Sequence, residues 1–334
     1  MKRRDLLYGL GAAGSAIVLN NCAFAPSTPQ RSRRAALFKV AMLLPRGADS
    51  DDWCREGMTG LGRIERELNS EIAYTDDINK GLPASLPQAL DRYAKEGFGF
   101  IIGHSGTFRD DMVKAAVRYP RTRFAIVASD SGNNRNFGAL GYRNSELGYL
   151  LGATLALQPK LQHIGLITSL PTPPIKQFNL AFQNALRRFA PDRKLSIEWV
   201  GSFDDEPKAI ALTQKLIGAG IDGLAMNCWT NNPAIVNVAV DRQLPMVVLG
   251  PDSRKLAPNL ILASGLIHVP ELILHGARLA QRGRWEGRQY LFGLSERVLE
   301  FIPTIGNLNP ESQKEIVDLH DQIRSGRLEV LEER

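Results

Sequence analysis

The strongest constraint on the fold is an internal repeat. Gly97 and Gly220 each stand between a helical pattern and an apolar run, and they are 123 residues apart. Asp130 and Asp252, which follow later apolar runs, are 122 residues apart. Because the two offsets differ by a single residue, the two copies keep the same elements in the same order. The repeat therefore predicts two similar lobes built from one pattern.

In each copy, short apolar runs alternate with segments of helical periodicity. The expected strands are Leu37–Leu44, Ile72–Tyr74, Phe98–Ile102 and Phe124–Ala128, then His163–Ile167, Ile197–Val200, Gly223–Met226 and Met246–Leu249. The expected helices are Asp51–Leu68, Leu86–Glu96 and Asp110–Arg118, then Ile175–Phe189, Pro207–Ile217 and Ala234–Arg242. Strands that alternate with helices of this length form right-handed βαβ units around a parallel sheet. The sequence predicts an α/β protein with two Rossmann-like, doubly wound lobes.

Each copy places a carboxylate shortly after its last expected strand, Asp130 in one and Asp252 in the other. Open parallel sheets bind ligands at the carboxyl ends of their strands. Two such lobes joined by short hinges would bring both sets of strand ends to one cleft. Asp130 and Asp252 are therefore candidate ligand-binding residues, although an Asp at the end of a strand can equally cap a turn.

Residues 1–25 have the features of an export signal. Lys2, Arg3 and Arg4 precede a 14-residue apolar run, Leu6–Leu19. As a helix this run would rise roughly 21 Å, which is short of the ~30 Å hydrocarbon core of a bilayer. The run therefore indicates a signal rather than a membrane-spanning anchor. The adjacent arginines are similar to a twin-arginine export signal.

Cys22 ends the sequence Leu-Asn-Asn-Cys, which resembles a bacterial lipobox. Lipidation of Cys22, which would anchor the chain to the membrane, is the favoured prediction. Cleavage after the small-x-small sequence Ala23–Ala25 and an incidental cysteine are the alternatives. Residues 26–35 have linker composition and predict a flexible, cationic tether. We expect an exported bacterial protein that is periplasmic or anchored as a lipoprotein.

The charges and the cysteines exclude several classes of function. Residues 1–35 hold six basic residues and one acidic residue, so they account for five of the six net positive charges. The remaining body is nearly neutral and lacks the basic surface that nucleic-acid binding needs. Cys54 and Cys228 are widely spaced, and we expect unpaired thiols, with a bridge between them as the alternative. No His or Cys spacing predicts a metal site or a cofactor.

Six segments, in order and across most of residues 37–330, carry a family resemblance. They are Tyr119–Pro120 with Phe124–Asp130, Glu146–Gly152, Ile164–Ile167 with Pro174–Phe182, Gly201–Asp205, Leu249–Asp252 and Asp321–Val330. Together they resemble the basic membrane protein family of bacterial substrate-binding lipoproteins, typified by purine-nucleoside receptors of ABC importers. The resemblance implies the type I periplasmic-binding-protein fold, in which a three-crossover hinge joins the lobes. The lobes are expected at 36–143 plus about 265–293, and at 144–264 plus about 294–334.

The resemblance also implies ligand contacts. Trp53 stands where members of the family stack an aromatic ring on the base, and Phe178 matches their second-lobe aromatic. Asp130 matches the acidic residue after the fourth strand, and Asp252 the carboxylate that holds ribose hydroxyls. The expected ligand-binding residues are Trp53, Cys54, Ser105, Asp130, Phe178, Trp229 and Asp252.

Two positions depart from the family pattern. Cys54 replaces an Asn that usually follows the first aromatic, and Ile267 replaces a Lys that usually follows the second crossover. Neither replacement can supply the amide or the cation that it displaces. The departures weaken the case for a purine nucleoside as the ligand, but they leave the case for a binding protein intact.

One motif suggests an enzyme. Gly103-His-Ser105-Gly-Thr107 follows an expected strand and nearly spells the nucleophile elbow of hydrolases, but Thr107 replaces the second glycine. The elbow needs small residues on both sides of the serine. A serine esterase that uses the Gly103–Ser105 turn is therefore a remote alternative, and the prediction is a protein without catalytic activity.

The predicted function is that of an extracytoplasmic solute-binding protein of an ABC importer. The lobes would close on a small nucleoside-like or related polar molecule and present their surfaces to a permease and its ATPase. The alternative is a sensor in which the same closure signals to a membrane receptor or kinase. The sequence does not separate these two roles.

Overall fold

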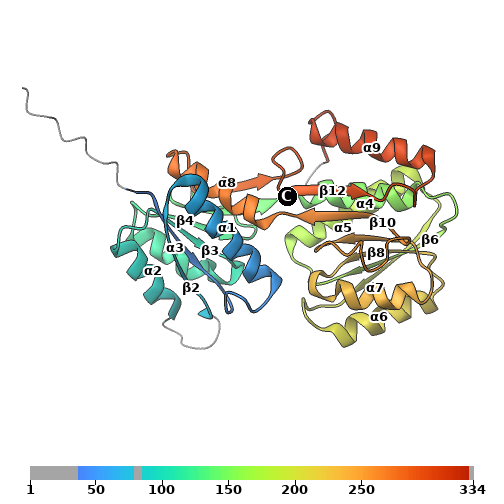
Figure 1. The fold of residues 1–334 in the computed structure, drawn as a ribbon, viewed down its shortest axis with the longest axis horizontal. Coiled ribbons are helices and arrows are strands. Elements are labelled where there is room, and N and C mark those ends of the chain that lie inside the picture. Colours follow the sequence, from blue (N-terminus) through green and yellow to red (C-terminus); the bar gives the residue numbers. More distant parts are fainter. Residues whose placement is uncertain (1–36, 79–84, 331–334) are drawn as a thin grey trace, which may run out of the picture. The chain divides into compact units, whose positions relative to one another are not determined.

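The computed structural model describes residues 37–78 and 85–330 (Figure 1). The predictions that concern the export signal, Cys22 and the tether lie outside these residues. All eight predicted strands and all six predicted helices are present, with bounds that agree within three residues. The strands form two separate six-stranded sheets, one in each lobe.

The first sheet has the order β11-β5-β4-β3-β1-β2, and all of its strands are parallel. Its strands are β1 (Lys39–Leu43), β2 (Glu71–Thr75), β3 (Phe100–Gly103), β4 (Arg123–Val127), β5 (Phe137–Tyr142) and β11 (Gln289–Phe292). The helices of this lobe are α1 (Asp52–Leu68), α2 (Ser85–Lys95), α3 (Arg109–Arg118) and α8 (Val269–Gln281), with the 3-10 turn η2 (Gly106–Phe108) after β3.

The two faces of the first sheet carry separate cores. Val40 and Met42 of β1 pack with α1 and α8, whereas Ala41 and Leu43 pack with α2 and α3. This division follows from the strand period of two, since successive side chains point to opposite faces. A strand buried on both faces reads as a continuous apolar run, which is the signal that predicted β1.

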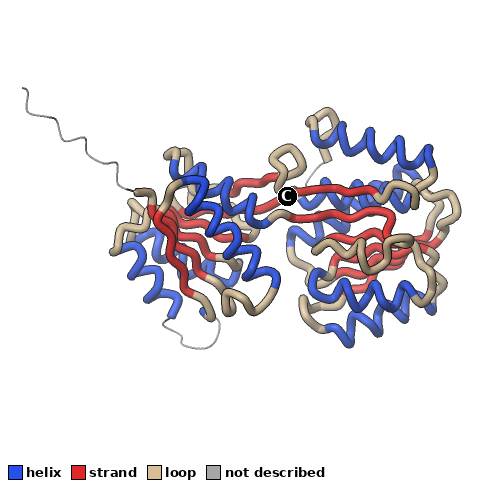
Figure 2. Tube along the Cα trace, viewed as in Figure 1, coloured by secondary structure: helices blue, strands red, loops and turns tan. Residues whose placement is uncertain are grey.

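The second sheet has the order β12-β10-β9-β8-β6-β7, in which only the pair β10 and β12 is antiparallel. Its strands are β6 (His163–Thr168), β7 (Lys194–Trp199), β8 (Gly223–Asn227), β9 (Met246–Leu249), β10 (Ile261–Ile267) and β12 (Leu299–Pro303). Helices α4 (Asn144–Ala156), α5 (Pro173–Phe189) and α9 (Pro310–Arg324) cover one face, and α6 (Glu206–Gly218) and α7 (Asn232–Val240) cover the other (Figure 2). The 3-10 turn η3 (Trp229–Asn231) follows β8, as η2 follows β3.

The repeat is visible at the level of single residues. Gly97 and Gly220 have φ values of 82° and 80°, which belong to the left-handed region that favours glycine. In each copy, the residue after the glycine donates its backbone N–H to the last turn of the preceding helix. This is the hydrogen bond of a Schellman cap. The same turn therefore leads from helix to strand in both lobes.

The chain crosses between the lobes three times, from β5 to α4, from β10 to α8 and from β11 to β12. The fully buried helix α4 packs closely against α5 beside the first crossover. A Cβ atom on Gly148 would lie 2.3 Å from the carbonyl oxygen of Phe178, and one on Gly152 would lie 2.6 Å from that of Phe182. These glycines allow the two helix backbones to approach each other, which fixes the start of α5 beside the hinge.

Within the described residues, no helix combines the length and the apolar character that crossing a bilayer requires. The same part of the chain contains no group of three or more His, Cys, Asp or Glu side chains placed to hold a metal ion.

Candidate ligand-binding cleft

An aromatic platform lies at the strand ends of the first lobe. The indole of Trp53, on the first turn of α1, stacks on the imidazole of His104 with ring centroids 4.4 Å apart and an interplanar angle of 16°. Trp53 Nε1 donates to the backbone carbonyl of His104 at 2.9 Å, and His104 Nε2 donates to the carbonyl of Trp53 at 2.7 Å. These reciprocal bonds hold the Trp53 ring in one orientation.

His104 is completely buried beneath this platform. A Cβ atom on Gly57 would lie 2.9 Å from its ring, so the missing side chain of Gly57 makes room for the imidazole. Burial lowers the pKa of His104 to about 4, because desolvation disfavours the charged form. The imidazole is therefore neutral near pH 7. Its Nδ1 atom is buried without a hydrogen-bond partner.

Trp229 meets the platform from the second lobe. Its ring stands edge-on to that of Trp53, with centroids 6.3 Å apart and an interplanar angle of 81°. Trp229 is the first residue of η3 and has a φ of 48°, a left-handed conformation that is unfavourable for a bulky side chain. Its Nε1 atom is buried and has no hydrogen-bond partner. Backbone strain and an unpaired donor thus coincide at Trp229.

Other buried polar atoms without partners cluster near Trp229. Thr168 and Asn227 are the last residues of the adjacent strands β6 and β8, and they are paired in register. The hydroxyl of Thr168 and Nδ2 of Asn227 have no partner, and neither has Nδ2 of Asn231 in η3. Buried polar groups in folded proteins are nearly always hydrogen-bonded. These exceptions lie at the carboxyl ends of parallel strands, the edge at which open sheets bind ligands.

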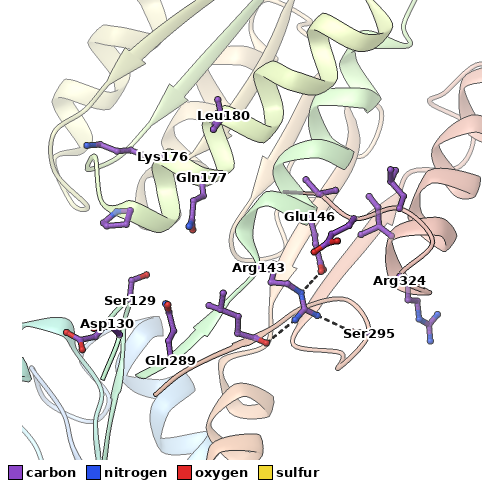
Figure 3. Close-up of a pocket in the computed structure, with 18 of the residues that line it drawn as sticks. Ser129, Asp130, Arg143, Glu146, Lys176, Gln177, Leu180, Gln289, Ser295 and Arg324 are labelled. Carbon is purple, nitrogen blue, oxygen red and sulfur yellow. Dashed lines mark hydrogen bonds and ion pairs between the residues drawn. The ribbon is translucent and has the colours of Figure 1, made fainter. Parts of the chain in front are cut away.

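A cavity of about 1580 Å³ lies against the hinge and is lined by both lobes (Figure 3). Ser129, Asp130 and Gln289 line it from the first lobe, and Lys176 and Gln177 of α5 line it from the second. The close-up shows Gln177 on the opposite side of the cavity from Asp130 and Gln289. Polar groups from both lobes can thus reach a molecule held there.

Asp130 both stabilises a turn and lines the cavity. Its Oδ2 accepts from Arg109 Nε at 2.5 Å, and its Oδ1 accepts from the backbone N–H of Gly132 at 2.7 Å. The second bond is an Asx turn, the alternative that sequence reasoning had left open. The side chain nevertheless lines the cavity. Its position at a strand end follows from the repeat.

A network of ion pairs links the first and third crossovers. Arg143 donates from Nε to Glu146 Oε1 at 2.6 Å and from Nη2 to Glu296 Oε2 at 2.5 Å. It also donates to the hydroxyl of Ser295 and to the carbonyl of Leu291. Figure 3 shows Arg143 between the lobes with bonds radiating from its guanidinium. The crossovers are therefore held together beside the cavity.

The structure places Asp252 apart from the cavity. Both of its oxygens accept from the Arg254 side chain, at 2.9 and 2.8 Å, and the backbone N–H of Arg254 adds a third bond at 3.1 Å. The hydrogen bond with the Arg254 guanidinium lowers the pKa of Asp252 to about 2. The carboxylate is exposed, and all three of these hydrogen bonds come from Arg254.

Three other predicted residues face away from the cleft or have structural partners. Phe178 is fully buried and stacks on Phe182 in the core of the second lobe, so its ring has no face open to a ligand. Cys54 is fully buried, and it and Cys228 are free thiols, as expected. The hydroxyl of Ser105 accepts from the backbone N–H of Thr107 and is 2.8 Å from its Oγ1, so Ser105 caps η2.

Sequence reasoning missed several residues of the cleft. It gave His104 no role of its own, although His104 directly follows β3 in the motif that suggested a hydrolase. It did not consider Gln177 and Gln289, which line the cavity from both lobes. The strand-end position was a usable signal for His104, whereas no local pattern marked the two glutamines.

Two doubly wound lobes, three crossovers and a cleft at the strand ends define the class of a two-lobed substrate-binding protein. A family model described as "ABC transporter substrate-binding protein PnrA-like" (Bmp) matches residues 37–334. The chain belongs to this family, as the resemblance predicted. Proteins of this class act outside the cytoplasm as the substrate-binding components of ABC transporters.

Individual relatives are distant but span most of the chain. The purine-binding protein of Brucella abortus (strain 2308) is 25% identical over 258 residues, which are 77% of this chain and 72% of that protein. The transcriptional activator protein med of Bacillus subtilis (strain 168) is 22% identical over 313 residues, 93% and 92% of the two chains. A solute-binding protein of an ABC transporter system from Aeropyrum pernix K1 has a similar fold, with a TM-score of 0.70 at 16% identity over 89% of this chain and 94% of that one.

Proposed function

We propose that the protein captures a small nucleoside-like or related polar molecule for an ABC importer, by closing its lobes around the three crossovers. The observation that carries this proposal is the platform of Trp53 on His104, which meets Trp229 of the other lobe. A rigid aromatic ring at the strand ends is suited to stack on a flat ligand. The purine-binding relative from Brucella supports a ligand of this shape.

Stacking alone does not give useful affinity. An aromatic ring stacked on a base contributes about 1–3 kcal/mol, whereas micromolar binding requires about 8 kcal/mol. Hydrogen bonds must supply much of the difference. The polar side chains of the cavity, Asp130 among them, are available for this purpose.

A thermal-shift screen of nucleosides, nucleobases, sugars and small carboxamides tests the proposal, followed by calorimetry on the compounds that stabilise the protein. Trp53→Ala should weaken binding of a flat ligand by about 1–3 kcal/mol. Trp199, half-buried at the end of the edge strand β7, provides the matched control. Trp199→Ala should leave affinity unchanged. Equal affinity in the Trp53 variant and the wild type would contradict a stacking role.

A second function, ligand sensing, is favoured by one observation. A relative that aligns over more than nine-tenths of both chains is a transcriptional activator. Reconstitution with a permease and ATPase pair separates the two roles. An importer component should raise the rate of ATP hydrolysis when its ligand is present. A sensor should leave that rate unchanged and bind a receptor in a ligand-dependent manner.

The same proposal includes lipid attachment at Cys22, export through the twin-arginine route and retention at the membrane surface. Its support is the sequence pattern of residues 1–25. Mass spectrometry of the protein from a bacterial membrane fraction should find an acylated N-terminal Cys22. Cys22→Ser should move the protein to the soluble fraction, and an unmodified chain that starts after Ala25 would show cleavage at the alternative site instead.

A further inference from the structure

Two apolar side chains at the hinge pack against the cores of both lobes. Tyr142 is the last residue of β5 and Ile267 is the last residue of β10, so each stands where the chain leaves one lobe for the other. Both side chains pack against the core that α1 and α8 cover in the first lobe, and against the core that α4, α5 and α9 cover in the second. Among the described residues, no other half-buried apolar side chain packs against a core of each lobe. These first-lobe and second-lobe cores are therefore continuous through Tyr142 and Ile267.

The third crossover contributes one buried side chain to each of the same two cores. Leu294 belongs to the second-lobe core and Val298 to the first-lobe core. Backbone hydrogen bonds join this crossover to the other two. Arg143 N–H donates to the carbonyl of Phe292 at 2.9 Å, and His268 N–H donates to that of Val298 at 2.8 Å. The three crossovers therefore form one hydrogen-bonded unit.

Apolar packing suits a place where one lobe rotates against another. The hydrophobic effect is non-directional and depends on the area removed from water, whereas hydrogen bonds weaken steeply when their angles change. A side chain close to the axis of a rotation moves little relative to either lobe. Tyr142 and Ile267 can therefore stay covered while the angle between the lobes changes. A cation at position 267 would have to leave water for two apolar cores, which is costly.

We propose that Tyr142 and Ile267, the apolar hinge pair, form the contact about which the lobes rotate, and that this contact limits how far the lobes separate. The hinge pair acts whatever molecule the cleft takes, so its role goes beyond the proposed function. Ile267, which stands where the family pattern has a Lys, thereby serves the movement of the lobes instead of the recognition of a ligand.

Hydrogen exchange and small-angle scattering of the full chain, both without ligand, test the proposal. Ile267→Ala removes packing from both cores at once. The backbone N–H groups of Arg143 and His268 should then exchange about 10-fold faster, because weaker packing lets the crossovers open locally, and the radius of gyration should increase. Ile267→Leu conserves volume and should keep both values. Tyr142→Ala should act in the same direction as Ile267→Ala.

Two other isoleucines provide matched controls. Ile72 of β2 is half-buried and packs against the first-lobe core alone, and Ile197 of β7 is half-buried and packs against the second-lobe core alone. Ile72→Ala and Ile197→Ala remove the same atoms from one core each. They should speed exchange within their own lobe but leave the radius of gyration and exchange at Arg143 and His268 at the wild-type values.

The outcomes decide on the hinge pair separately from the proposed function. If Ile267→Ala keeps the wild-type exchange and radius, or if either control changes exchange at the crossovers as much, the proposed role of the pair is wrong. Should Ile267→Ala fail to fold, Ile267→Val, which removes one methylene group, should speed exchange at the crossovers by a smaller factor, and an unchanged rate would equally contradict the role. Because no ligand is used, a failed ligand screen leaves the hinge pair standing, and failure of the hinge pair leaves the proposed function standing.

Discussion

At the scale of single residues, His104 shows how burial couples the platform to pH. The imidazole titrates near its ordinary pKa of 6.5 in the unfolded chain, and its pKa is about 4 in the folded protein. Between pH 4 and pH 6.5, His104 therefore binds more protons in the unfolded state than in the folded state. The contribution of His104 to stability is therefore complete above pH 6.5 and is lost as the pH falls towards 4.

We expect this loss to be on the order of 3 kcal/mol between pH 6.5 and pH 4. Urea unfolding at a series of pH values measures it. His104→Gln keeps a donor for the carbonyl of Trp53 but does not titrate, so its unfolding free energy should depend less on pH in this window. An identical pH dependence in the variant and the wild type would show that other groups cause the loss.

The two repeat glycines permit a symmetric test. A Cβ atom at Gly97 or Gly220 would meet no atom within 4 Å, so only the backbone conformation opposes a side chain there. Gly97→Ala and Gly220→Ala should each lower the unfolding free energy by about 1 kcal/mol. Chemical denaturation of both variants checks the value. A cost in one lobe but not in the other would mean that the two turns are not equivalent.

The buried thiols lead to a prediction about reactivity. Cys54 and Cys228 are both fully buried, and desolvation raises the pKa of Cys228 to about 12. Because the thiolate is the reactive form, both should resist alkylation in the native protein and react in denaturant. Peptide mapping after treatment with iodoacetamide distinguishes them from Cys22. Rapid labelling of either residue under native conditions would contradict the described core.

At the scale of elements, Arg143 links two of the three crossovers that form the hinge. Arg143 joins Glu146 of the first crossover to Glu296 of the third, and the side chain of Glu146 is only 9% exposed. Removing the cation from this partly buried pair leaves the Glu146 carboxylate without its counter-charge. Arg143→Met should therefore destabilise the protein by about 3 kcal/mol. Arg288→Met, which breaks the exposed pair with Glu286, should cost less than about 1 kcal/mol.

Urea unfolding of both variants decides this point. If the two substitutions cost the same, the crossover network would contribute no more than a surface ion pair. Ligand affinity provides a second measurement. Arg143 lines the cavity, and loosening two crossovers at once should change closure as well as stability.

Helix α1, which the sequence predicted, is buried on one face only, whereas helix α4, which it did not predict, is buried on all sides. Helix α1 was predicted from its helical periodicity, and Asp51, which the prediction counted as the first helical residue, instead caps the helix by accepting from the backbone N–H of Cys54. Helix α4 was not predicted as a helix, since every residue from Asn144 to Ala156 is buried and the sequence shows no polar face. Strand β12 was missed for another reason. It lies outside the two repeated series and joins its sheet as the antiparallel partner of β10.

At the scale of the whole molecule, the repeat predicted where the cleft lies but not which side chains complete it. Parallel sheets in two similar lobes place the residues after β3, β4 and β8 at strand ends, and Ser105, Asp130 and Trp229 are found there. Contacts with neighbouring residues decided where the other predicted side chains, Asp252 and Phe178, are held. Arg254 occupies Asp252 from two residues away, and the approach of α4 draws Phe178 into the core. Such partners depend on side-chain directions, which a sequence pattern does not specify.

Closure is the property of the whole molecule on which the proposed function depends. The cavity of about 1580 Å³ is larger than the 300–1,000 Å³ usual for small-molecule sites. A small ligand would leave much of it filled with water, so binding should be accompanied by approach of the lobes, which adds contacts from Gln177 and Lys176. Small-angle scattering should show a smaller radius of gyration with a saturating compound from the thermal-shift screen than without it. Trp53→Ala, at the same concentration of that compound, should keep the larger radius because less ligand binds. An unchanged radius in the saturated wild type would mean that this protein binds without closing, and that a permease must recognise the bound state by other means.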